Sequence, residues 1–227
     1  MINQTRIKAV YNGLSDLKDK VVFVGGSTVS FYSDTPQLEA RPTDDIDIVV
    51  EIITYADQQK IDEQLRSIGF RNDTTSGVIC RYLYEGIIVD VLPTSGEHLG
   101  FRTRWYQEGF ENSTIFEIDP AHKIRILSTP YFLATKFEAF KDRGKNDGRT
   151  SQDFEDIIYI LEHRKRIWLE ISELSGEIKK YLLAEFKSLK SHPGLREWIE
   201  SHVERITTPA TNSILENIEK LINKSET

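Results

Sequence analysis

Cysteine is nearly absent from this chain of 227 residues, in which Cys80 is the single one. One cysteine excludes a disulfide framework and a Cys₄ zinc site, and it suits a reducing compartment. No run approaches the roughly 20 apolar residues that a membrane span needs, and no basic-then-apolar leader opens the sequence. We therefore expect a cytoplasmic protein with no membrane partner.

Three common signatures of catalysis are missing as well. The sequence contains no Gly-x-Ser-x-Gly, no His-Glu-x-x-His and no Gly-x-x-x-x-Gly-Lys pattern, so nothing supports a hydrolase, a zinc protease or a P-loop protein. Positive charge is also scarce, because 29 Lys and Arg residues face 36 Asp and Glu residues. An acidic chain must use a local basic patch for any contact with RNA.

What the sequence does contain is two β-branched runs that meet polar residues at one end. The run 21–27 (VVFVGGS) stops at a glycine pair, which lets a backbone approach a phosphate closely. The run 44–50 (DDIDIVV) opens with carboxylates. Strand residues two apart share a face, so Asp45 and Asp47 should point the same way. Together the two runs could hold Mg²⁺ and a triphosphate, although a solvated strand start that caps a loop is an alternative.

A third carboxylate lies inside an apolar run. Residues 78–84 and 87–93 predict a hairpin with the turn Glu85-Gly86. Asp90 stands in the middle of the second run, where an unpaired carboxylate is costly. If this strand lies beside the run that begins at residue 44, three carboxylates converge on a hard-metal site, and Asp90 could take a proton from an attacking hydroxyl. A core Arg or backbone donors could satisfy Asp90 instead.

These motifs resemble those of the nucleotidyltransferase superfamily, in which one strand ends in Gly-Gly/Ser, a second carries Asp-hydrophobic-Asp and a third carries another Asp. The context RPTDDID at 41–47 is most similar to the AbiEii-type toxins of abortive-infection and toxin–antitoxin systems. Those toxins continue with a helix that contains a Lys and a helix that begins Asp-x-x-Asp. Here Lys136 matches the Lys, Asp153 and Asp156 match the pair, and the resemblance covers roughly residues 5–165.

The resemblance implies a role for each matched residue. Asp45, Asp47 and Asp90 would bind one or two Mg²⁺ ions, and these three residues with Lys136 form the expected catalytic set. Lys136 would neutralise phosphate charge. The other residues expected to bind the NTP are Gly25, Gly26, Ser27, Arg41, Asp153 and Asp156.

Several of these assignments have simpler alternatives. A helical Lys such as Lys136 is commonly solvated or salt-bridged, and an Arg before Pro, such as Arg41, is commonly solvated. Asp153 and Asp156 are three residues apart and share a helical face, so they could simply orient Lys136 or Arg149.

The expected fold is α/β (α+β): a small mixed nucleotidyltransferase sheet flanked by helices, followed by a C-terminal helical region. Residues 1–127 should form the catalytic core, and residues 128–227 the helical region that completes the NTP site. The patterns within the core predict helices at about 4–20 and 54–68, a short helix after Ser27, and further strands near 114–118 and 123–127.

The expected function is that of a Mg²⁺-dependent enzyme which moves an NMP from an NTP to an acceptor hydroxyl and releases pyrophosphate. The resemblance implies a toxin that acts on tRNA 3′ ends, with a cognate antitoxin as a partner. RNA contacts would fall on Arg164–Arg166, on Lys179, Lys180, Lys187 and Lys190, and on the loop 100–106 (GFRTRWY), although interspersed Glu residues favour a solvated helix. The alternatives are an aminoglycoside-like or protein acceptor, or a catalytically silent nucleotide-binding module.

Overall fold

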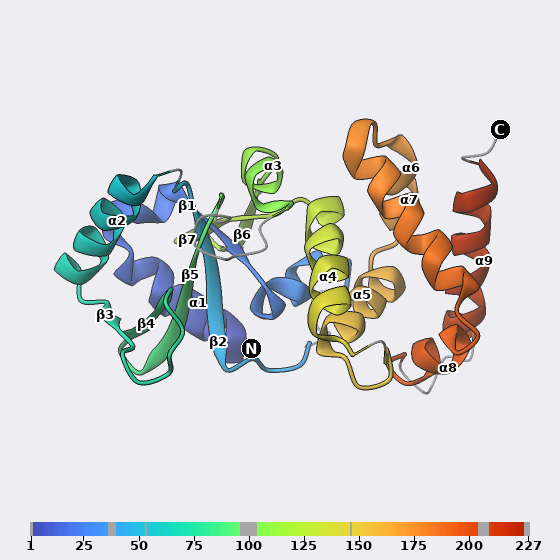
Figure 1. The fold of residues 1–227 in the computed structure, drawn as a ribbon, viewed down its shortest axis with the longest axis horizontal. Coiled ribbons are helices and arrows are strands. Elements are labelled where there is room, and N and C mark those ends of the chain that lie inside the picture. The colour runs from blue at the N-terminus through green and yellow to red at the C-terminus, as the bar shows by residue number, and fades with distance from the viewer. Residues whose placement is uncertain are drawn as a thin grey trace. The chain divides into compact units, whose positions relative to one another are not determined.

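The computed structural model describes residues 2–35, 40–52, 54–95, 104–145, 147–203 and 209–224. The chain divides into two compact units, and the colour bar of Figure 1 lets their residues be found by number. The first consists of Met1–Thr28 and Arg41–Ser128, and is called the sheet unit here. The second consists of Val29–Ala40 and Thr129–Thr227, and is called the helical unit.

The sheet unit is built on a mixed sheet of seven strands in the order β3-β4-β5-β2-β1-β7-β6. The strands are β1 Val21–Val24, β2 Asp45–Val50, β3 Arg71–Asn72, β4 Arg81–Tyr84, β5 Ile87–Pro93, β6 Thr114–Asp119 and β7 His122–Ile126. Strand β2 runs antiparallel to β1 and parallel to β5. The mixed sheet that the sequence predicts is therefore confirmed, and its two motif-bearing runs are central strands.

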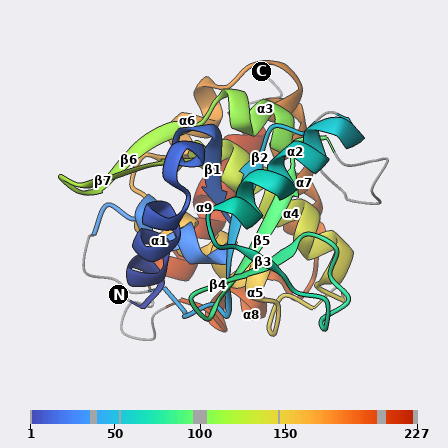
Figure 2. The ribbon, with the colours of Figure 1, turned by 90° about the vertical axis from the view of Figure 1, so that its left-hand side faces the viewer.

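Helices cover this sheet. They are α1 Ile2–Gly13, η1 Ser15–Lys20, α2 Tyr55–Ser67 and α3 Tyr106–Glu111, of which η1 is a 3₁₀ helix. Helix α1 contacts β2, β5 and β7, and Figure 2 shows α1 and α2 in front of the strands. The single helix expected at 4–20 is wrong, because Ser15 has a φ of +50° and so ends the α-helix.

The predicted hairpin is present but its first strand is shorter than expected. Glu85 and Gly86 both have positive φ, which matches the right-handed twist of the flanking strands. Strand β4 begins only at Arg81, however, and the side chain of Ile79 is 70% exposed. The apolar character of residues 78–80 therefore does not mark a strand.

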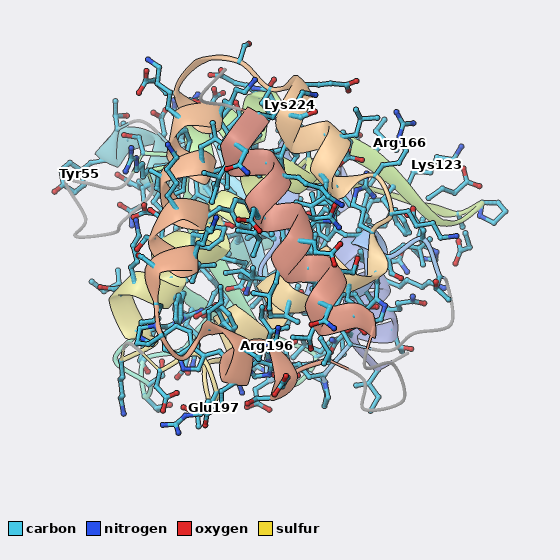
Figure 3. All side chains as sticks on the ribbon, turned by 90° about the vertical axis from the view of Figure 1, so that its right-hand side faces the viewer. Tyr55, Lys123, Arg166, Arg196, Glu197 and Lys224 are labelled. Carbon is cyan, nitrogen blue, oxygen red and sulfur yellow. The ribbon has the colours of Figure 1, made fainter. Side chains whose placement is uncertain are left out.

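The helical unit contains α4 Thr129–Arg143, α5 Gln152–His163, α6 Ile167–Glu173, α7 Gly176–Ser191, α8 Leu195–Glu200 and α9 Pro209–Lys224. Helix α4 packs against α5 and α7, and α7 packs against α9; Figure 3 views this unit with α9 towards the reader. Its core is aromatic, since Phe132, Phe137, Phe154 and Phe186 are at most 1% exposed. The predicted C-terminal helical region is confirmed.

A segment from the first half of the sequence belongs to the helical unit. It includes most of the 3₁₀ helix η2, Gly26–Tyr32. The ring of Tyr32 packs on Phe132 at 4.4 Å, and the backbone N–H of Asp34 donates to the His163 carbonyl at 3.0 Å. The Asp34 carboxylate accepts from the N–H of Lys165 at 2.7 Å.

Within the described residues, no helix combines the length and the apolarity that a membrane crossing needs.

Candidate active site

Three carboxylates lie on one face of the sheet. Asp45 and Asp47 are partly exposed at the start of β2, whereas the intervening Ile46 and the following Ile48 are fully buried. Asp47 pairs in register with Asp90 on the parallel neighbour β5. Residues opposite each other in a ladder point to the same face, and neighbouring strands lie about 4.8 Å apart. The predicted adjacency of the two Asp-bearing strands is therefore confirmed.

The glycine turn after β1 makes room for one of these carboxylates. Val24, the last residue of β1, lies opposite Asp47, and Gly25 follows with a φ of +73°. A Cβ atom at Gly25 would lie 2.0 Å from Oδ2 of Asp47. The sequence suggests that this glycine lets the backbone approach a phosphate, and the structure gives a second reason for it, which is room for the Asp47 carboxylate.

The rest of the turn is held by buried hydroxyls. The short helix expected after Ser27 begins two residues earlier, at Gly26, and is the 3₁₀ helix η2. Ser27 is 1% exposed, and its Oγ donates to the Val24 carbonyl at 3.4 Å. Thr28 was not predicted as a site residue, yet its Oγ1 donates to the Gly25 carbonyl at 2.9 Å.

The segment that leads into β2 is fastened to α1. Nδ2 of Asn3 donates to the Arg41 carbonyl at 3.1 Å, and Oδ1 of Asn3 accepts from the N–H of Thr43 at 3.2 Å. Arg6 donates to the carbonyls of Thr43 and Asp44. Arg41 itself is half-buried. Neither Asn3 nor Arg6 was predicted, although a polar Asn on the buried face of an N-terminal helix is a signal for such a role.

Asp90 has a cationic partner inside the protein. Its carboxylate is 9% exposed and accepts from Nε and Nη2 of Arg81, both at 2.8 Å. The same Nη2 atom lies 3.5 Å from Oδ2 of Asp45. The hydrogen bonds to Asp90 raise the pKa of Arg81 above its usual value, although burial opposes this. The core Arg that the sequence left open as an alternative is therefore Arg81.

The carboxylates on this face are of the ligand type that a hard divalent cation takes, but they are not gathered around one point. Carboxylate oxygens are the ligands that Mg²⁺ prefers. Because Gly25 has no Cβ atom, the Asp47 carboxylate can pack against the turn. Among the residues that the structure describes, no cluster of three or more His, Cys, Asp or Glu side chains is arranged to ligate a metal. Arg81 supplies the positive charge beside Asp45 and Asp90 instead.

A second charged cluster lies within the helical unit. Nζ of Lys136, a residue that is 4% exposed, lies 3.2 Å from Asp153 and 2.6 Å from Asp156. Burial lowers the pKa of Lys136, but the charges of Asp156 and Asp153 outweigh it and the pKa lies above 10.5. Burial likewise raises the pKa of Asp153, but the hydrogen bond from Arg143 and the charge of Lys136 bring it below 3.8.

Arg143 completes this cluster and was not predicted. It donates from Nε and Nη2 to the two oxygens of Asp153 at 2.6 and 2.8 Å. Its position seven residues after Lys136 puts both on one face of α4, which is the signal that the sequence offered. Arg149 pairs with Asp147 and Glu197 instead. The two cations that Asp153 and Asp156 could orient were Lys136 and Arg149. In the structure both carboxylates lie against Lys136.

Three of the basic residues expected to contact RNA form ion pairs with acidic side chains. Lys180 lies 2.7 Å from Glu177, and Lys190 lies 3.0 Å from Glu219. Arg164 pairs with Glu170 at 2.9 Å. Arg102 lies outside the described residues. These pairs favour the simpler interpretation of α7 as a solvated amphipathic helix.

The buried cluster predicts a pH window for stability. We expect Lys136→Met to lower the free energy of unfolding by about 3–5 kcal/mol near neutral pH, because it takes the buried cation from Asp156 and leaves Asp153 with Arg143 alone. The wild-type contribution of Asp153 should hold above pH 3.8 and be lost as the pH falls through its lowered pKa; that of Lys136 should hold below pH 10.5 and be lost as the pH rises through its raised pKa. Urea unfolding from acid to alkaline pH measures both.

The matched control is Lys141→Met, on the same helix. Lys141 pairs with Glu138 and Glu185, but its side chain is 44% exposed. A surface pair of this kind should cost less than about 1 kcal/mol. Equal losses for the two variants would contradict the importance of the buried cluster.

The turn after β1 predicts a stability difference between two glycine substitutions. Gly25 and Gly77 have the same φ of +73°, but a Cβ meets Asp47 at Gly25 and nothing within 4 Å at Gly77. Both Ala variants bear the same backbone strain, so we expect Gly25→Ala to be the less stable by about 1–3 kcal/mol in thermal unfolding. Indistinguishable melting curves would show that Asp47 does not need the glycine.

Comparison with known proteins relates the chain to one family and to solved structures. A family model described as the nucleotidyl transferase AbiEii toxin of a type IV toxin–antitoxin system matches residues 8–217. Among solved structures, the chain resembles the solution structure of the antibiotic-resistance factor ANT(2'')-Ia, with a TM-score of 0.51 and 12% identity over 84% of this chain and 97% of that chain. This likeness shows the fold alone. No curated protein matches the chain.

The family match confirms the resemblance that the motifs around residues 25–27 and 45–47 predict. It spans both the sheet unit and most of the helical unit. The chain is therefore a nucleotidyltransferase, and it belongs to the AbiEii family of nucleotidyl transferase toxins.

Proposed function

We propose that this nucleotidyltransferase uses Mg²⁺ held by Asp45, Asp47 and Asp90 to transfer an NMP from an NTP to the 3′ end of tRNA. The observation that supports the metal site is the register of Asp47 with Asp90, with Asp45 on the same face of the sheet. The tRNA acceptor is supported by the resemblance to the AbiEii-type toxins.

Each carboxylate has a defined task in this proposal. Bound Mg²⁺ would polarise the α-phosphate and neutralise the leaving pyrophosphate. Asp45 and Asp47 would hold the ion at the start of β2. Asp90 accepts the proton of the acceptor hydroxyl as that oxygen forms its bond to the α-phosphorus and the bond to pyrophosphate breaks. Arg81 orients Asp90 through two parallel hydrogen bonds.

The family resemblance implies further residues that contribute to NTP binding. We assign this role to Lys136, Asp153, Asp156, Gly26, Ser27 and Arg41. The pairing of Lys136 with both carboxylates supports a cation held in one orientation. The partner expected for a toxin of a type IV system is a cognate antitoxin that relieves its effect.

A second acceptor class is worth testing because the chain is acidic and two of its candidate RNA-binding lysines are paired with acids. The chain carries a net charge of −7, and the basic residues Lys180 and Lys190 are each paired with a Glu. A protein of this kind offers RNA little electrostatic attraction. A small hydroxylated acceptor, such as an aminoglycoside, needs no basic surface.

The metal site predicts the effect of a single isosteric change. Asp47→Asn should reduce nucleotide transfer by at least about 10²-fold, because it removes charge that stabilises the transition state. The fold should persist, since the carboxylates on this face repel one another. Transfer from each α-³²P-labelled NTP to total bacterial RNA, with Mg²⁺ or with EDTA, measures the loss.

Asp44→Asn is the matched control for this test. Asp44 is exposed, adjoins the same motif and loses the same charge, so its variant should keep its activity. Equal turnover by wild type and Asp47→Asn, or transfer that persists in EDTA, would remove the metal assignment.

The molecule that becomes labelled with ³²P identifies the acceptor. We expect label in tRNA, with transfer that weakens as salt rises because phosphate contacts release counterions. Expression of the wild type, and not of Asp47→Asn, should then arrest bacterial growth. Label that enters an aminoglycoside or a protein, and never RNA even at low salt, would replace the tRNA proposal with the other acceptor class.

A further inference from the structure

A cation of the protein itself, Arg81, lies against two of the three carboxylates of the proposed metal site. Arg81 stands directly across from Asp90 in the antiparallel pairing of β4 with β5. One of its atoms, Nη2, lies 2.8 Å from Oδ2 of Asp90 and 3.5 Å from Oδ2 of Asp45. A single positively charged nitrogen therefore bridges two of the three proposed metal ligands.

We propose that Arg81 is an internal counter-cation that competes with a free divalent metal for Asp45 and Asp90. Metal binding then requires Nη2 to leave Asp45, and the site favours a metal that arrives with the negative charge of an NTP. This inference rests on the proposed metal-binding function of the carboxylates. It assigns Arg81 as a positioning residue that sets the order in which the site is filled.

The two contacts of Arg81 differ in a way that supports this movement. Asp90 receives two hydrogen bonds of 2.8 Å in a fork geometry, which holds both side chains in one orientation. Asp45 receives one contact of 3.5 Å, at the limit of a hydrogen bond. The contact to Asp45 is thus the one that yields, while Asp90 remains oriented for proton transfer.

Charge explains why this competition favours a metal–nucleotide complex. The guanidinium remains charged at every physiological pH, so it always repels a cation at the neighbouring carboxylates. A bare divalent ion meets that repulsion in full. A metal bound to a triphosphate carries a net negative charge with its ligand, and the guanidinium then attracts the complex.

The experiment measures free Mn²⁺ binding to the protein without nucleotide. We expect Arg81→Gln to bind Mn²⁺ at least about ten-fold more tightly than the wild type in an EPR titration, because a positive charge near the ligands is removed. The matched control is Arg71→Gln on the adjacent strand β3, which removes an exposed Arg and the same charge. Its affinity should stay within about two-fold of the wild type.

Two results separate this inference from the proposed function. Equal or weaker Mn²⁺ binding by Arg81→Gln, with binding still abolished by Asp47→Asn, would overturn the competition and leave Arg81 as a support for Asp90. Mn²⁺ binding that Asp47→Asn leaves intact would instead overturn the metal site itself.

A second measurement covers the case in which Arg81→Gln does not fold. In ¹⁵N-labelled wild type, the side-chain Nε and Nη resonances of Arg81, assigned by their loss in Arg81→Lys, report its contacts. We expect the Nη signals to shift on addition of Mg²⁺ with a non-hydrolysable NTP, while the Nε–H bonded to Asp90 persists. Unchanged Nη signals at saturating ligand would overturn the proposal.

Discussion

The gathering of carboxylates on a central pair of strands is the constraint on which the sheet unit depends. Asp47 and Asp90 lie side by side across the β2–β5 ladder, and Asp90 is almost fully buried. Uncompensated charges in such a place would destabilise the fold. Arg81 meets this need from the next strand, and the same pairing gives Asp90 one fixed orientation. The compensation of the buried charge and the fixed orientation of Asp90 therefore come from a single residue, Arg81.

The helical unit also contains a buried charge that must be paired, but here the charge at the centre is a cation. Lys136 is the buried cation there, with Asp153 and Asp156 beside it, and the exposed Arg143 pairs with Asp153. Buried ions are tolerated only when each is paired and hydrogen-bonded. A motif that the family resemblance assigns to nucleotide binding is thus also a structural element of the unit that carries it, and substitutions in it must be compared with matched stability controls.

The close approach of β1 and β2 depends on the absence of one side chain. Gly25 follows the strand with a positive φ, and the Asp47 carboxylate occupies the space where its Cβ would be. The buried hydroxyl of Thr28 closes the turn on the Gly25 carbonyl. The first two motifs of the family are therefore one packed feature, because the glycine of one makes room for the acid of the other.

Local pattern was enough to find the motif-bearing strands β1, β2 and β5, the Gly-Gly-Ser turn and the carboxylates, because alternation along β2 and the glycine punctuation are properties of neighbouring residues. The same local information left Asp90 with two interpretations. Only tertiary structure decided that Arg81 lies across from it, since strand register joins residues that pattern alone cannot pair. Likewise Arg143 and Asn3 were missed, because their roles depend on partners 10 and 38 residues away that only the folded chain brings within hydrogen-bond distance.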